Sequence, residues 1–265
     1  MIGLAAGAAR ATLDPDDGGR VTSLVVDEAE LLVPRAPDGN ASSYGCFPMV
    51  PWAGRIRDGR FTWQGVTHQL PVNLPPHAIH GTGFTRPWNV VAADERSTRM
   101  EVDLGPDWPF AGHAVHALGL TPDGLDLRLE VHAAGEPFPA WCGWHPWWRR
   151  PVELSFHPGA MYRRDATGIP TGELVAVPPG PWDDCFTRGA DPPVLRWPSG
   201  LSVAVESSAD YFVVYDQLDH AVCVEPQTAP PDAVNLGLAT VIEPGRPLVA
   251  RAAFRWGRPI LDIRG

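Results

Sequence analysis

Proline and glycine punctuate almost every window of this 265-residue chain. There are 30 Pro and 27 Gly, and they are spread along the whole length. Because Pro breaks the hydrogen-bond ladder of a helix and Gly favours turns, long helices are hard to place anywhere. The chain is therefore expected to fold mostly from short extended segments, with few short helices.

Alternation of apolar and polar residues supports that expectation. Residues 124–132 place four apolar side chains on one face and Asp126, Arg128, Glu130 and His132 on the other. Segments 99–104, 201–206 and 249–256 alternate in the same way, and segments 21–26, 211–215 and 221–225 are predicted as more fully buried strands. Many short strands with frequent turns predict an all-β protein built as a large antiparallel β-sandwich. We expect one domain spanning residues 1–265.

Charge excludes several classes of function. The formal net charge is -10, which disfavours nucleic acids and anionic membranes as partners. All 21 basic residues are Arg, so a Schiff-base lysine, a pyridoxal-phosphate site and a P-loop lysine are excluded. We expect no cofactor.

The cysteines suggest free thiols. Cys46, Cys142, Cys185 and Cys223 form no C-x-x-C pair, which makes a structural zinc site improbable. No signal peptide, transit peptide or run of about 18 apolar residues is evident. The expectation is a cytoplasmic protein, either a monomer or a homodimer.

Three polar residues stand out in apolar, turn-rich surroundings. His80 lies in HAIHG, His145 in GWHPWW and Glu225 in VCVEPQTAPPDAVN. Two imidazoles and a carboxylate suit proton transfer on a neutral, polar substrate. The alternatives are a surface-loop His, a hydrogen-bonded core His and a solvent-facing Glu. A carboxylate at the end of a buried strand should have a raised pKa, as a general base requires. If the site is real, Glu225 and the ring of His145 should face each other across a sugar-sized gap.

Tryptophans surround His145, namely Trp141, Trp144, Trp147 and Trp148. Flat indole faces pack well against the C–H faces of sugar rings, but some of these rings must belong to the core. Trp147 is the predicted ligand contact.

Arginine and aspartate side chains supply further candidates. Arg55 and Arg57 alternate onto one face just before a predicted hairpin over residues 58–65, with Asp58-Gly59 as its turn. Asp183 and Asp184 could accept hydrogen bonds from sugar hydroxyls. The alternatives are exposed ion pairs and an acidic turn cap.

Two H-x-x-H pairs occur, His77 with His80 and His113 with His116. Such a pair shares a face only on a helix, and neither segment reads as helical. We therefore expect no metal.

Five segments in order resemble the aldose 1-epimerase (galactose mutarotase) family. They are PWAGRIRDGRFTWQG, NLPPHAIHG, GWHPWW, WDDCF and CVEPQTAPPDAVN, spanning about residues 40–240. The resemblance implies a large β-sandwich with an open sugar cleft and no metal or cofactor. Better-known members often have His-Gly-Gly where this chain has His80-Gly81-Thr82, which leaves the preferred sugar open.

The resemblance also implies roles. Glu225 would be the general base at the anomeric hydroxyl, and His145 the general acid at the ring oxygen. His80 would be a second imidazole that hydrogen-bonds near the ring oxygen and the anomeric centre. Arg55 and Asp183 would bind the ligand. The implied activity is mutarotation of a free aldohexose such as glucose or galactose.

Other functions remain open. A hexose-6-phosphate mutarotase could use Arg149, Arg150, Arg163 and Arg164 to bind phosphate. A non-catalytic sugar-binding protein would need no acid–base pair. A glycoside hydrolase or lyase would need a second carboxylate or a tyrosine base, and Asp183 could supply the carboxylate.

Overall fold

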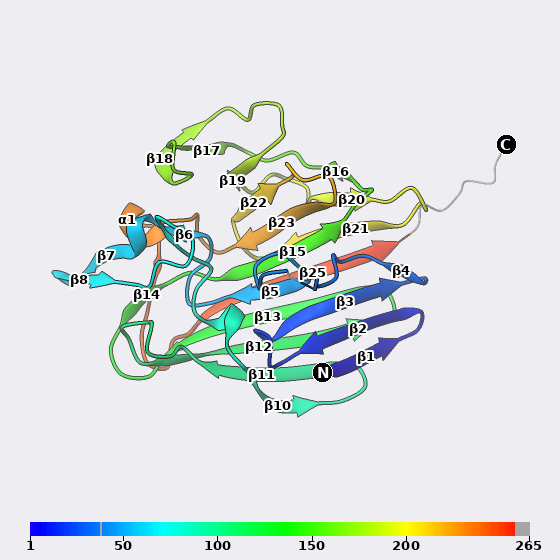
Figure 1. Ribbon diagram of the computed structural model, residues 1–265, viewed down its shortest axis with the longest axis horizontal. Helices are drawn as coiled ribbons and strands as arrows, with labels where there is room; N and C mark the ends of the chain where they lie inside the picture. Colours follow the sequence, from blue (N-terminus) through cyan, green and yellow to red (C-terminus); the bar gives the residue numbers. More distant parts are fainter. Residues whose placement is uncertain (38, 258–265) are drawn as a thin grey trace.

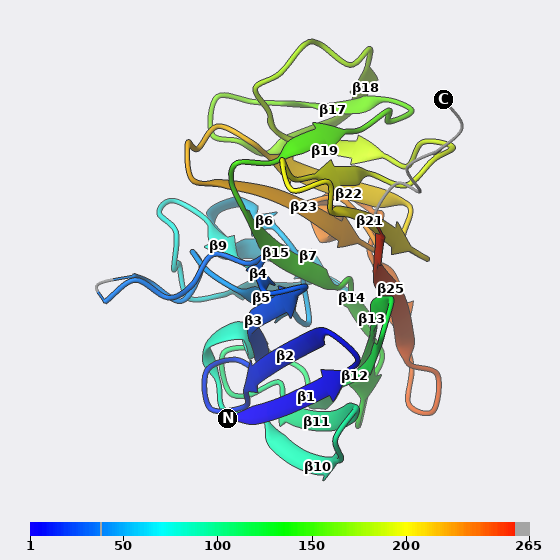
Figure 2. The ribbon, with the colours of Figure 1, turned by 90° about the vertical axis from the view of Figure 1, so that its right-hand side faces the viewer.

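A computed structural model describes residues 1–37 and 39–257. Two large antiparallel sheets dominate it, which confirms the predicted all-β sandwich (Figure 1). In spatial order, the eleven-stranded sheet consists of β1 (Ile2–Ala6), β2 (Ala9–Asp14), β3 (Arg20–Val26), β5 (Cys46–Met49), β15 (Gly143–Arg149), β23 (Ala221–Gln227), β22 (Tyr211–Tyr215), β19 (Asp183–Thr187), β17 (Met161–Arg164) and β18 (Pro170–Val175), with β4 (Ala29–Glu30) paired to β3. Figure 2 shows this sheet descending from β18 at the top to β1.

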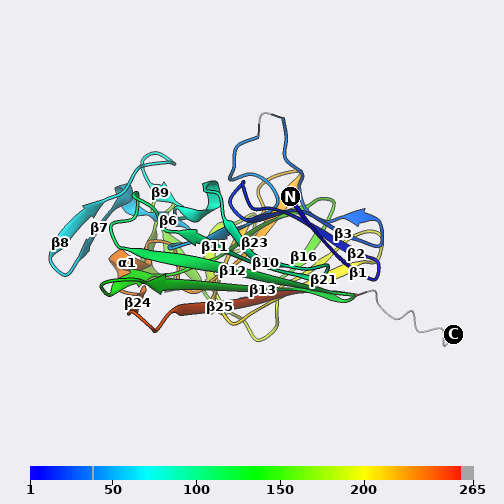
Figure 3. The same ribbon diagram turned by 90° about the horizontal axis from the view of Figure 1, so that it is seen from below.

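The second sheet has eight strands and forms the other layer. Its spatial order is β10 (Asn89–Ala93), β11 (Ser97–Asp103), β12 (Gly112–Thr121), β13 (Gly124–Ala133), β25 (Leu248–Gly257), β21 (Ser202–Ser207), β20 (Val194–Arg196) and β16 (Glu153–Ser155). Seen from below, β12, β13 and β25 lie as a layer beneath the first sheet (Figure 3).

Three two-stranded ribbons and short helices complete the described chain. The ribbons are β6 (Arg55–Ile56) with β9 (Ala78–Ile79), β7 (Arg60–Trp63) with β8 (Val66–Gln69), and β14 (Phe138–Ala140) with β24 (Thr240–Ile242). The helices are α1 (Ala233–Leu236) and two 3-10 turns, η1 (Arg57–Gly59) and η2 (Gly83–Thr85). None of these helices is long and apolar enough to cross a membrane.

The core lies between the two sheets, where the alternating strands bury their apolar faces. The ring of Trp148 on β15 meets the ring of Phe254 on β25 edge-on, with centroids 4.8 Å apart. The indole Nε1 of Trp144 donates to Nε2 of His116 on β12 at 3.1 Å, so this contact also joins the layers. Even-numbered residues of β15 therefore point into the core, and its odd-numbered residues point away from it.

Each segment predicted as a strand is one, but three details differ. Residues 21–26 are not buried throughout, because Thr22, Ser23 and Val25 of β3 are half-buried. Tyr211–Tyr215 alternates between buried and half-buried residues rather than being buried throughout, because one face of β22 lines a cleft. The hairpin predicted over 58–65 is shifted to Arg60–Gln69. Asp58-Gly59 is indeed left-handed, but it forms the 3-10 turn that enters the hairpin. The reversal itself uses Gln64-Gly65, whose φ values of 48° and 80° suit a two-residue turn.

Candidate active site

A cleft of about 440 Å³ opens on the face of the eleven-stranded sheet that points away from the core. Its floor comes from adjacent strands, because Trp147, Cys223, Tyr215 and Asp183 lie opposite one another in register on β15, β23, β22 and β19. Side chains two residues apart in a strand share a face. The odd-numbered residues of these four strands therefore converge on one surface, although they are far apart in sequence.

The cleft lining contains all six residues predicted for the site, namely Arg55, His80, His145, Trp147, Asp183 and Glu225. Two predicted neighbours lie elsewhere. The Arg57 guanidinium pairs with Asp165 at 2.8 Å, because the chain leaves the strand conformation at η1 and no longer alternates. Asp184 alternates away from Asp183 and pairs with Arg164 at 2.9 Å.

His145 and Glu225 are in direct contact. The imidazole Nε2 lies 3.2 Å from the carboxylate Oε1, and the two residues are only 6% and 3% exposed. The expected sugar-sized gap between them is therefore wrong, because β15 and β23 are hydrogen-bonded neighbours and their odd-numbered residues share a face. A ligand must approach this pair from the open side of the cleft.

Burial favours the neutral form of both groups. It raises the pKa of the Glu225 carboxyl well above its usual range, and the Asp183 charge raises it further, against a hydrogen bond from Gln227 and the charge of Arg55. Burial also lowers the pKa of His145 to about 3, and the charge of Arg20 acts in the same direction. We therefore interpret the contact as a neutral carboxylic acid and imidazole that share one proton, rather than as an ion pair.

Aromatic rings hold the His145 imidazole in place. The rings of Phe47 and Trp147 stack on it, with centroid distances of 4.8 and 5.2 Å and interplanar angles of 27° and 9°. The His80 ring meets it edge-on at 4.9 Å. Trp147 lines the cleft, and its indole stacks on the His145 ring. Its contact with a ligand stays a prediction.

A strained turn places His80 at the cleft. His80 and Gly81 both have left-handed backbones, with φ values of 65° and 78°. A Cβ at position 81 would lie 2.0 Å from the carbonyl oxygen of Val50, so this position requires glycine. The His80 amide donates to the Gly54 carbonyl at 3.0 Å, and the Asn73 side chain accepts from the Ile79 amide at 2.7 Å. Burial lowers the pKa of His80 well below its usual value, so its ring is neutral.

Asp183 lies between two arginines. Its Oδ2 is 3.1 Å from a guanidinium nitrogen of Arg164 and 3.6 Å from one of Arg55, which also donates to the Gly168 carbonyl at 3.3 Å. Burial raises the pKa of Asp183, while both arginines lower it. The network fixes Arg55 and Asp183 at one wall of the cleft.

Several lining residues were not predicted. Tyr215 and Gln227 line the cleft, and the fully buried Cys223 lies beside Glu225. Gln227 donates to the Glu225 Oε2 at 3.0 Å. Alternation with Glu225 was the signal for both Cys223 and Gln227. Polar residues of the connecting loops complete the rim, namely Asn40, Ser42, Ser43, Asn73 and Gln217, and no sequence pattern singled them out.

Neither H-x-x-H pair forms a metal site. The His77 ring bonds the Asp58 amide and the Thr167 carbonyl, whereas His80 lines the cleft. His113 stacks on His132, while His116 faces the core. A different set of metal-ligand type is present in the described chain: His145, Cys223 and Glu225 bring one donor atom each to within 4.8 Å of one another.

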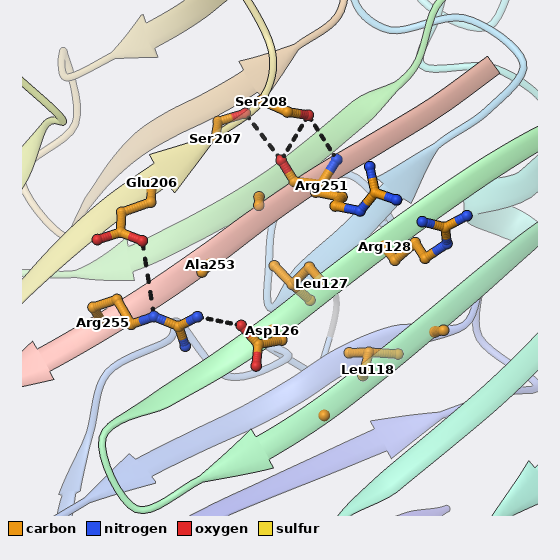
Figure 4. A pocket seen from close by; sticks show the side chains of 13 residues that line it. Leu118, Asp126, Leu127, Arg128, Glu206, Ser207, Ser208, Arg251, Ala253 and Arg255 are labelled. Atoms are coloured by element: carbon orange, nitrogen blue, oxygen red, sulfur yellow. Dashed lines mark hydrogen bonds and ion pairs between the residues drawn. The ribbon is translucent and has the colours of Figure 1, made fainter. Parts of the chain in front are cut away.

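A second hollow, of about 570 Å³, lies on the outer face of the eight-stranded sheet (Figure 4). Its Arg255 is paired with Asp126 and Glu206. Ser207 and Ser208 bond the backbone of Arg251 rather than its guanidinium. Its lining residues include no His and no buried acid, so it lacks the proton-transfer groups of the first cleft.

Comparisons with known proteins identify the family and the fold. A family model described as Aldose 1-epimerase matches residues 4–255. The chain is 33% identical over 135 residues to the uncharacterized protein YphB of Escherichia coli K12, a match that covers 50% of this chain and 46% of YphB. It is 24% identical over 278 residues to the uncharacterized protein YihR of the same strain, covering 93% and 90%. A galactose mutarotase-like protein from Clostridium acetobutylicum has the same fold, with a TM-score of 0.85 at 20% identity, covering 97% of this chain and 94% of that one.

Proposed function

The chain belongs to the aldose 1-epimerase family, and we propose that it is a mutarotase that interconverts the α and β anomers of a free aldohexose such as glucose or galactose. One observation carries this proposal above the others. A histidine and a glutamate lie in contact on the floor of an open cleft, both buried, with 3.2 Å between Nε2 and Oε1. Burying two titratable groups costs stability, and proton transfer to a ligand is a function that would justify that cost.

The rest of the cleft suits a polar, uncharged ligand. Its rim carries amide and hydroxyl side chains, and Arg55 is the one basic side chain, apart from histidines, among the described lining residues. Buried polar atoms at the floor have no partner in the described structure, namely His80 Nδ1, His145 Nδ1 and Gln227 Oε1. Sugar hydroxyls offer both donors and acceptors for such groups.

Mutarotation requires the C1–O5 bond to break, the aldehyde to rotate about C1–C2, and the ring to close on the other face. In the proposed reaction Glu225, as carboxylate, takes the proton of the anomeric hydroxyl. His145, as imidazolium, gives a proton to the ring oxygen. The pair then consists of a carboxylic acid and a neutral imidazole, and ring closure reverses both transfers.

The pair carries one proton in total at each stage. The carboxylate–imidazolium form that opens the ring and the neutral form that burial favours differ only by transfer across the 3.2 Å contact. No proton needs to be taken from solvent during turnover. Such acid–base assistance typically contributes about 10²–10⁴-fold in rate per group.

We assign supporting roles to the other lining residues. His80, edge-on to His145, would hydrogen-bond near the ring oxygen and the anomeric centre. Arg55 and Asp183, held by Arg164, would bind sugar hydroxyls. Trp147 keeps the His145 ring in its plane and closes one side of the cleft.

The arginines considered for phosphate binding lie outside the cleft lining. Arg150 bonds backbone carbonyls of Asp216 and Leu218, Arg163 pairs with Glu173, and Arg164 pairs with both aspartates. Arg149 is exposed and outside the lining. This placement favours a free sugar over a 6-phosphate.

The proposal is tested by one-dimensional NMR of anomer exchange on glucose, galactose and glucose 6-phosphate. We expect faster exchange of a free sugar with wild-type protein and near-background exchange with Glu225→Gln, which keeps the shape of the side chain. Faster exchange of the phosphorylated sugar would favour the hexose-6-phosphate reading. Sugar binding without accelerated exchange in wild type would identify a binding protein instead.

A further inference from the structure

The thiol of Cys223 has no part in the proposed proton transfer, yet it lies beside the His145–Glu225 pair. Cys223 and Glu225 are two residues apart on β23, so their side chains share the face that forms the cleft floor. His145 reaches the same point from β15. A ring nitrogen of His145, the thiol Sγ and a carboxylate oxygen all lie within 4.8 Å of one another, and the three residues are buried.

The spacing of these atoms suits a tetrahedral zinc ion. Zinc bonds nitrogen and oxygen at about 2.0–2.2 Å and sulfur at about 2.3 Å, so tetrahedral angles place N and O ligands about 3.3 Å apart and sulfur about 3.6 Å from each. The 3.2 Å between His145 Nε2 and Glu225 Oε1 already matches. The thiol would need to approach by at most about 1.2 Å, given the 4.8 Å limit.

The chemistry of the donors points to the same class of ion. An imidazole, a thiolate and a carboxylate are the ligand types that zinc combines, whereas calcium and magnesium prefer oxygen alone. A thiolate and a carboxylate together carry two negative charges, which a divalent ion balances in this buried position.

We propose that His145, Cys223 and Glu225 bind Zn²⁺ at the cleft floor and that this ion inhibits the protein reversibly. Binding releases the thiol proton and the proton shared by His145 and Glu225 to solvent, and no oxidation or reduction occurs. The fourth position faces the cleft, where water or a sugar hydroxyl completes the tetrahedron. The lone pairs that move protons are then occupied by the metal.

Metal binding is measured without reference to activity. Zn²⁺ is titrated against a chromophoric chelator, and Co²⁺ is used as a spectroscopic substitute whose thiolate bond absorbs in the near ultraviolet. For wild type we expect one equivalent of tightly bound metal and a thiolate-to-cobalt band. Cys223→Ser should lose the band and bind Zn²⁺ at least about 100-fold more weakly, since even supporting residues around a metal contribute 10–100-fold.

Two further variants make the result specific. Cys185→Ser removes another buried thiol, which lies on β19 within reach of the Glu225 charge. Because Cys185 is not one of the three donors, this variant should bind Zn²⁺ as wild type does. Glu225→Gln removes a different ligand, so the thiolate band should persist at higher Co²⁺ concentrations. Circular dichroism of each variant verifies folding. The absence of a thiolate band in wild type, or equal Zn²⁺ affinity in folded Cys223→Ser, overturns the proposal.

Inhibition, unlike binding, rests on the proposed function. If that function holds, anomer exchange should fall in proportion to Zn²⁺ occupancy and recover on chelation. Metal bound through Cys223 without slower exchange would leave the site standing and refute the acid–base role of the pair. Slow exchange in Glu225→Gln together with no metal binding in wild type would refute the site alone.

Discussion

The contact between His145 and Glu225 predicts that the two residues act as one unit. Glu225→Gln removes the proton acceptor but keeps an oxygen to accept from Gln227 and an amide to donate to the imidazole. His145→Gln removes the other partner. General acid or base catalysis contributes about 10²–10⁴-fold, so each substitution should lower kcat/KM by that factor, or about 3–5 kcal/mol.

The double variant carries the sharper expectation. If the two groups acted independently, their losses would multiply to about 10⁴–10⁸-fold. Because they share one proton across 3.2 Å, removing either disables both, and the double variant should be hardly slower than the slower single variant. The coupling free energy should then be about 3–5 kcal/mol, comparable to a single loss.

Anomer exchange by NMR, or polarimetry of freshly dissolved α-D-glucose, measures these rates after subtraction of the spontaneous reaction. Glu206→Gln is the matched control, because Glu206 is an exposed glutamate on the outer face of the other sheet. It should leave the rate unchanged. Multiplicative losses in the double variant would refute the shared-proton interpretation, and near-wild-type rates for Glu225→Gln would refute the assignment of the base.

Three further outcomes follow from the structure. The pH profile of kcat/KM should have its acid limb well below pH 6.5, because burial lowers the pKa of His145 to about 3. Its basic limb should lie above the ordinary carboxyl range, because burial raises the pKa of Glu225. An acid limb near pH 6–7 would contradict this. Burial lowers the pKa of His116 to about 4 in the folded state. Between pH 6.5 and 4 the unfolded chain therefore binds a proton at His116 that the folded chain does not. About 3 kcal/mol of the free energy of unfolding should be lost as pH falls through that window. His116→Gln should reduce this loss in urea titrations followed by tryptophan fluorescence, and an unchanged pH dependence would argue against it. Gly81→Ala, whose Cβ would meet the Val50 carbonyl at 2.0 Å, should cost more than about 2 kcal/mol in the same assay, and an unchanged urea midpoint would show that the turn relaxes freely.

Local patterns were sufficient to predict seven of the strands. The alternation over residues 124–132 corresponds to β13 (Gly124–Ala133), since one face of that strand packs in the core and the other meets solvent. The hairpin was misplaced because two dipeptides, Asp58-Gly59 and Gln64-Gly65, both adopt left-handed conformations. Which of them reverses the chain depends on the packing of His77 and Gln69 against Asp58, which sequence alone does not reveal.

The sequence predicted six residues that line one cleft, but it did not predict how they are arranged. His80, His145 and Glu225 were found from their unusual surroundings, and they do line one cleft. The predicted gap between His145 and Glu225 was wrong because strand order is a property of the whole sheet. Nothing in the sequence shows that β15 lies beside β23. Cys223 alternates with Glu225 in the sequence, but metal-ligand spacing within one segment does not reveal a set of donors that comes from two strands.

The cleft floor rests on inner strands of the larger sheet, and this position bears on how the protein loses activity on heating. β15 and β23 have hydrogen-bonded neighbours on both sides, and their other faces are packed in the core. Amides in such strands usually exchange with solvent only when the whole molecule opens. Thermal inactivation should therefore coincide with global unfolding, with no lower temperature at which the floor alone loosens and the fold persists.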